Sequence, residues 1–142
     1  MRRKEHADGI KASGAEVVMG DLNDKAAITE QAVKHDIIFH TATADHLPSV
    51  EAILDGVKQR SNRGRSTIFI HTSGTSVLDD NAQGEFRSDK IYHDNVRSEV
   101  DSVPDSAIHR EIDLAIVRSQ QNPPDDKAKV AIMIPPLIYG CT

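Results

Sequence analysis

The chain of 142 residues is long enough for one domain with a real core, since a globular chain of this size buries roughly 70% of its unfolded surface. Its 38% hydrophobic and 27% charged residues exclude a disordered chain, which has fewer apolar residues or a larger charge excess. The net charge of −5 and the 4% aromatic content, without Trp, argue against nucleic-acid binding.

No run of the sequence reaches the roughly 18 apolar residues of a membrane span, and its polar start lacks the apolar centre of a signal peptide. The single cysteine, Cys141, cannot form a disulfide within the chain. These features predict a cytoplasmic protein.

The first half of the chain alternates helix and strand signals. Its expected elements are a helix over 4–13, a strand over 15–20, a helix over 24–34 and a strand over 36–41. Asn23 or Asp24 can cap the second of these helices, because a short polar side chain accepts hydrogen bonds from the first helical turn.

The second half continues the alternation. Its expected elements are a helix over 48–60, a strand over 67–72, a helix over 107–121 and a strand over 130–134. Pro48 favours the first turn of a helix, and Pro135 ends the last strand. The polar stretch 74–105 is long enough to indicate a functional loop or a frayed region with one short helix.

The strands are mostly continuous apolar runs, which are typical of parallel strands covered on both faces. Strands that alternate with helices predict an α/β fold with right-handed crossovers. The sequence therefore predicts one α/β domain over 1–142, with about four mostly parallel strands.

Four motifs occur in order along the chain: VVMGDLND, DIIFHTATA, FIHTSGTSVL and IPPLIYG. Together they resemble the extended and atypical short-chain dehydrogenase/reductase family, which includes epimerase/dehydratase-like and NmrA-like fungal NAD(P)-binding proteins. The resemblance implies a truncated Rossmann-like fold. The family's first strand and Gly-rich phosphate-binding turn would precede Arg2 and are not in the sequence.

The resemblance assigns cofactor contacts to six residues: Arg2, Arg3, Asp21, Leu22, Thr41 and Ala42. The two arginines would read a 2′-phosphate, the next two residues the adenine, and the last two would lie beside the nicotinamide ribose. The arginines could instead be a solvated terminus, and Asp21 could cap the next helix. Without oriented amides at a helix N-terminus to hold the pyrophosphate, we expect NAD(P) to bind weakly, if at all.

The family's chemistry uses a Tyr with a Lys four residues later, whose ammonium lowers the phenol pKa. Tyr92 is followed at that distance by Val96. The hydroxyl partner should follow the strand at 67–72, where Ser73 and Thr75 flank a glycine at the matching position. Ser73, Thr75 and Tyr92 are thus the catalytic candidates, and we expect the chain alone to be weak or inactive.

Three histidines, His40, His46 and His71, follow or end neighbouring predicted strands and could hold zinc. The chain lacks a spacing such as HExxH, and the family motifs already account for two of these positions. We therefore interpret them as hydrogen-bonded histidines and predict no metal.

Three functions stay open: a remnant NAD(P)-binding domain, a non-enzymatic interaction or signalling protein, and a reductase or epimerase that another chain completes. The expected topology places the helices over 24–34, 48–60 and 107–121 on one side of the sheet. The other side would be a bare apolar face, which predicts a homodimer or higher oligomer. A gap beside the strand at 36–41 would be closed by the segment 15–20 or by another chain.

Overall fold

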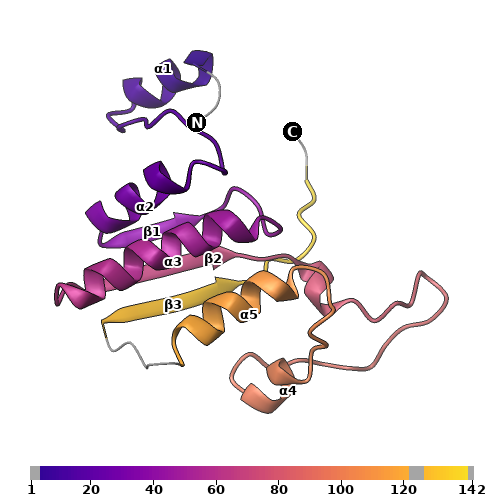
Figure 1. Cartoon of the computed structure of the whole chain (residues 1–142). Helices are drawn as coiled ribbons and strands as arrows, with labels where there is room; N and C mark the ends of the chain where they lie inside the picture. Colours follow the sequence, from indigo (N-terminus) through magenta and orange to yellow (C-terminus); the bar gives the residue numbers. More distant parts are fainter. Residues whose placement is uncertain (1–3, 122–126, 141–142) are drawn as a thin grey trace.

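The computed structural model describes residues 4–121 and 127–140 as a small parallel sheet with helices packed on one side (Figure 1). The elements in chain order are α1 (Lys4–Ala12), α2 (Lys25–Lys34), β1 (Ile37–His40), α3 (Leu47–Asn62), β2 (Thr67–Thr72), η1 (Thr75–Leu78), α4 (Arg97–Asp101), α5 (Arg110–Ser119) and β3 (Ala128–Met133). Within the described ranges no helix combines the length and apolar character that a membrane crossing requires.

The sheet has the order β1-β2-β3, and both strand pairs are parallel, which confirms the α/β class. The expectation of four strands is wrong, because residues 15–20 form no strand. A strand exists through the backbone bonds it makes to a neighbour. Residues 15–20 are not paired with β1, the edge strand they approach, and part of this segment lines a hollow instead.

Local signals explain where most helices begin. The Asp24 carboxylate accepts the N–H of Ala27 at 3.1 Å and caps α2. Pro48 lies in the first turn of α3, as expected. The helix predicted to start at 107 starts at Arg110, because His109 adopts a left-handed backbone with φ of 67° and interrupts the helical geometry.

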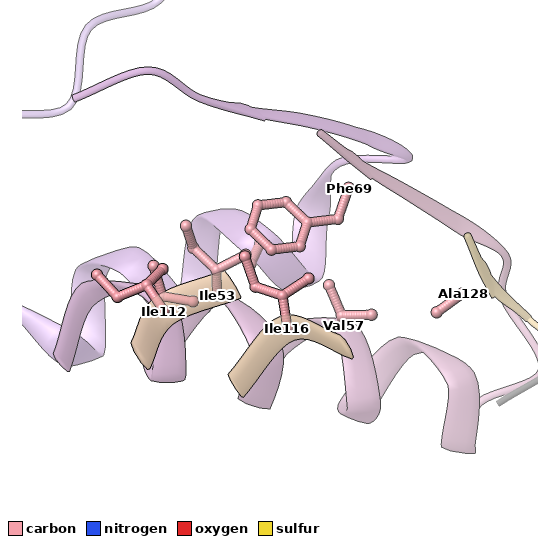
Figure 2. Close-up of a cluster of buried hydrophobic side chains, with 8 residues drawn as sticks. Ile53, Val57, Phe69, Ile112, Ile116 and Ala128 are labelled. Carbon is pink, nitrogen blue, oxygen red and sulfur yellow. The ribbon is translucent and has the colours of Figure 1, made fainter. Parts of the chain in front are cut away.

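The core lies between the sheet and the helices α3 and α5 (Figure 2). Phe69 projects from β2 into a cluster of aliphatic side chains, and its ring is completely buried. The labelled neighbours in Figure 2 are Ile53, Val57, Ile112, Ile116 and Ala128. Helix α2 extends this layer by packing on α3, where Gly56 allows close approach: a Cβ there would lie 2.5 Å from the Cβ of Ala32.

A buried arginine joins the elements at the amino end of the sheet. Arg60 is fully buried at the end of α3. Its guanidinium donates to the Thr67 hydroxyl and the Val33 carbonyl, both at 2.9 Å, and to the Ser66 carbonyl at 3.1 Å. It also forms an ion pair with Asp36. One side chain thus ties the end of α2 and the starts of β1 and β2 to α3.

The opposite face of the sheet, here called the bare face, is exposed and mostly apolar, with Lys129 of β3 beside Ile68 of β2. Its large side chains Ile37, Phe39, Ile68 and Met133 are 53%, 68%, 42% and 57% exposed. Their neighbours in the strand sequence point to the helices and are buried or half-buried. Figure 1 shows α2, α3 and α5 on the same side of the sheet, as the expected topology requires.

Candidate functional site

A mostly apolar hollow of about 560 Å³, here called the slot, runs beside the edge strand β1. Its other walls are the segment 18–22 and helix α2. We call the part formed by Asp21, Leu22 and Ala42 the mouth, and the part formed by Met19, Ile37 and Phe39 the trunk.

The topology places the mouth at the carboxyl end of the sheet. Ala42 follows the last residue of β1 by two positions, and Leu22 directly precedes the turn that starts α2. The side chains of Asn23 and His46 meet at 3.2 Å, which joins this turn to the start of α3. In open α/β sheets, ligands bind in crevices outside the carboxyl ends of the strands, so the mouth is the first place to look for one.

Three of the six cofactor candidates meet in the mouth: Asp21, Leu22 and Ala42 all line the slot. Thr41 is exposed beside it and is not part of its wall. Arg2 and Arg3 lie outside the described residues. The capping interpretation of Asp21 is wrong, because its Oδ1 accepts the N–H of Asn23 at 2.7 Å and Asp24 caps the helix.

The three catalytic candidates occupy different settings. Ser73 is 5% exposed, and its hydroxyl donates to Asp113 Oδ2 at 3.1 Å. Thr75 donates to the Pro135 carbonyl. Tyr92 belongs to the long segment before α4, which extends away from the sheet (Figure 1), and the Lys90 ammonium lies 4.4 Å from its ring centre. Their observed partners are structural ones.

Two of the three histidines form a buried pair under the helices. His40 and His71 are partners in the register of β1 and β2, and their Nδ1 atoms lie 2.8 Å apart with the rings stacked. One Nδ1 must therefore carry a proton and the other accept it. Burial lowers the pKa of both, that of His71 to about 4, and neighbouring histidines add to the effect. The hydrogen-bonded interpretation is confirmed for this pair and also for His46, whose Nδ1 accepts the N–H of Ser49 and caps α3.

A second polar group lies at the same end of the sheet, and the sequence analysis missed it. Asp113 in α5 is 2% exposed. Its burial raises the pKa of its carboxyl, and the Ser73 hydrogen bond partly offsets this. His109 contacts the Asp45 carboxylate at 2.5 Å, and its ring lies so close to Gly74 that a Cβ there would be 2.8 Å from Nε2. No local pattern marks these residues, because each partner comes from a distant part of the chain.

The inner members of these two polar groups are enclosed rather than open to a substrate, whereas the Asp45 side chain is 66% exposed. His71, Ser73 and Asp113 are at most 5% exposed. Among the described residues, no three His, Cys, Asp or Glu side chains are arranged to hold a metal ion. The slot is therefore the better candidate for binding a ligand.

Comparison with known proteins gives one informative match. The chain is similar to Oxidase ucsJ from Acremonium sp., with 36% identity over 130 residues. The match takes in 87% of this chain and 36% of the relative, so the chain spans little more than a third of that protein. No protein-family model and no solved structure matches the sequence.

Proposed function

We propose that the chain is a Rossmann-like NAD(P)-binding unit of the short-chain dehydrogenase/reductase type that takes the adenosine end of the cofactor weakly and does not catalyse hydride transfer alone. The observation that carries this proposal is the mouth of the slot. Asp21 and Leu22 there meet Ala42, twenty residues away, at the carboxyl end of a parallel sheet. The similarity to a protein named an oxidase supports an oxidoreductase origin.

The mouth fits a purine better than a pyrophosphate. Leu22 and Ala42 offer apolar contacts for the faces of a flat ring, and the Asp21 carboxylate can accept an amino N–H. The volume of about 560 Å³ lies within the range of small-molecule sites. However, the described residues that line the slot include no Lys or Arg, and the sequence contains no Gly-rich turn that could offer its amides to a phosphate.

Catalysis by this chain lacks its proton relay. Val96 occupies the position that would hold the lysine four residues after Tyr92, and Ser73 is buried against Asp113. The relay uses that lysine to assist proton transfer by the phenol, so this chain alone does not supply the full acid–base pair. A second chain that completes the site is the alternative, and assays with and without a full-length relative test it.

Calorimetric titration with AMP and with NAD(P)H tests the proposal. If only the adenosine end is held, the two ligands should bind with dissociation constants within about a factor of three, both weak. Asp21→Asn keeps the acceptor for Asn23 but removes the charge, and should weaken both ligands equally. Asp8→Asn, on the exposed side of α1, is the matched control. A one-to-one NAD(P)H complex at micromolar or tighter affinity would contradict the proposal.

A non-enzymatic interaction protein is the second candidate, and the bare sheet face favours it. Exposed apolar patches of several hundred Å² usually mark interaction sites in soluble proteins. Ile37, Phe39, Ile68 and Met133 form such a patch across the three strands. Loss of oligomers or of partner binding in an Ile68→Lys variant, with no effect on AMP binding, would favour this function over the first.

A further inference from the structure

The trunk of the slot lies along the edge strand β1, at the place where a further strand of the sheet would pair with it. The Asp36 carbonyl accepts the N–H of Ile68 in β2. Since backbone groups alternate along a strand, Ile37 and Phe39 turn their N–H and C=O groups away from β2, toward the slot. Both residues line the slot, and β1 has no strand on this side within the described part of the chain. An open edge of this kind is a template for a strand from another chain.

The same molecule carries an apolar segment whose end is almost fully exposed. Residues 134–140, here called the arm, leave β3 and extend beyond the sheet (Figure 1). Leu137, Ile138 and Tyr139 are 80%, 86% and 90% exposed. The four residues 137–140 contain no proline and equal β1 in length, and their three large side chains suit a strand that is buried on both faces.

We propose that the arm of one copy of the chain occupies the trunk of a second copy and pairs with β1, and that the second arm does the same in return. This inference deepens the predicted homodimer and does not rest on nucleotide binding. It also leaves the mouth open, because the trunk runs along β1 and the mouth lies beyond its carboxyl end.

The arm cannot lay all of residues 137–140 along the trunk of its own chain. The Pro135 carbonyl is held by the Thr75 hydroxyl, just past the end of β2. From there the position outside β1 is two strand spacings away, about 10 Å, whereas Leu137 follows Pro135 by two residues, about 7 Å when fully extended. A second copy is therefore needed to place residues 137–140 beside β1.

The area to be buried also favours exchange of arms over stacking of the bare faces. The three strands, of four, six and six residues, present only about 250 Å² when seen face-on, compared with roughly 800 Å² per partner in a stable interface. In an exchanged dimer each chain buries surface in two places, on its arm and in its slot. The arm therefore needs to bury only about half of the roughly 800 Å² per partner. Tyr139 is almost fully exposed, and its side chain alone can bury about 150–250 Å². Leu137 and Ile138 add two more side chains.

Sedimentation velocity of the full chain, from about 1 to 100 µM, tests the proposal. The wild type should form dimers in this range. Ile138→Asp in the arm and Met19→Asp in the trunk should each weaken dimerisation by about tenfold or more, because both put a charge into the contact. Both positions are substantially exposed, so circular dichroism should show unchanged folding. Ile91→Asp, at a loop residue that is 70% exposed, is the matched control and should still dimerise.

Mixing the two variants separates exchange from other dimers. A charge placed in the buried contact breaks that contact, so a dimer of either variant alone has two broken contacts. In a mixed pair the intact arm of Met19→Asp meets the intact slot of Ile138→Asp, so an equimolar mixture keeps one contact and should associate more tightly than either variant alone. A monomeric wild type, a normal dimer of Ile138→Asp, or a mixture without recovery would each overturn the proposal. So would an Ile68→Lys variant as weak as the arm variant, which would point to stacked bare faces instead.

Discussion

The two faces of the sheet carry the same kinds of side chain and have opposite surroundings. Phe69 on β2 points to the helices and is fully buried, whereas Phe39 on the adjacent strand points the other way and is 68% exposed. Both sides of each strand carry apolar side chains, although Lys129 lies on the bare side of β3 and His40 and His71 lie on the helix side. An apolar strand thus shows that both of its faces can be buried, but not that this chain buries them.

The largest expected difference between the faces comes from truncating the two phenylalanines. Phe69→Ala should lower the free energy of unfolding by about 3–5 kcal/mol, because it removes core contacts and leaves a cavity. Phe39→Ala should change it by less than about 1 kcal/mol, since the ring is mostly in water. Urea denaturation at a concentration where the chain is monomeric gives both values. Similar losses for the two variants would mean that the bare face is covered in solution.

Substitution of Arg60 tests how much its buried hydrogen bonds add to the stability that the apolar core provides. Arg60→Lys should cost about 2–3 kcal/mol, because an ammonium cannot reproduce the planar fork that serves Thr67, Val33 and Ser66 together. Arg65→Lys, at an exposed site 3.8 Å from Asp36, is the matched control and should cost under about 0.5 kcal/mol. Equal costs would show that the buried hydrogen bonds contribute little.

Elements with local cues were predictable from the sequence. Asp24 caps α2 and Pro48 starts α3 because each acts on its own helical turn. The segment 15–20 was not predictable, since a strand also needs a neighbouring edge at the right distance. The delayed start of α5 depends on His109, whose left-handed backbone no neighbouring residue announces.

The candidate site shows the same division. The resemblance assigned Asp21 and Leu22 to the adenine and Ala42 to the nicotinamide ribose, whereas the structure brings all three residues together in the mouth. The bond from Ser73 to Asp113 joins positions forty residues apart on different elements. Such pairs follow from the packing of α5 on the sheet, which a single sequence does not encode as a recognisable spacing.

The buried histidine pair on the helix-covered face of the sheet predicts that the free energy of unfolding depends on pH. The folded chain holds His40 and His71 neutral, with the His71 pKa near 4, whereas an unfolded histidine titrates near 6.5. Between these values the unfolded chain binds more protons, so stability is full above pH 6.5 and falls as the pH drops toward 4. At pH 5 the loss from His71 is roughly 2 kcal/mol.

Replacing the pair isolates this contribution from the carboxyls. Asp113 acts in the opposite direction, because its raised pKa makes the folded chain bind a proton more readily as the pH falls. The double variant His40→Phe/His71→Phe should lose less stability than the wild type between pH 7 and pH 5. His35→Gln, at an exposed site, should keep the wild-type slope. An unchanged slope in the double variant would assign the acid sensitivity to other groups.

Tyr92 lies outside both faces, in the segment before α4, and should give the smallest effect of all. Tyr92→Phe keeps the aromatic ring that the Lys90 ammonium contacts at 4.4 Å, so the free energy of unfolding should change by less than about 0.5 kcal/mol. Any NAD(P)-dependent turnover of the purified chain should also stay unchanged. The reason is that no lysine stands four residues after Tyr92, where the family's proton relay needs one. Lys90→Met is the matched control, because it removes the ring's cation and keeps the phenol.

A large drop in turnover for Tyr92→Phe, with folding intact, would show that the phenol takes part in catalysis. A similar drop for Lys90→Met would then identify Lys90 as the cation that replaces the missing lysine.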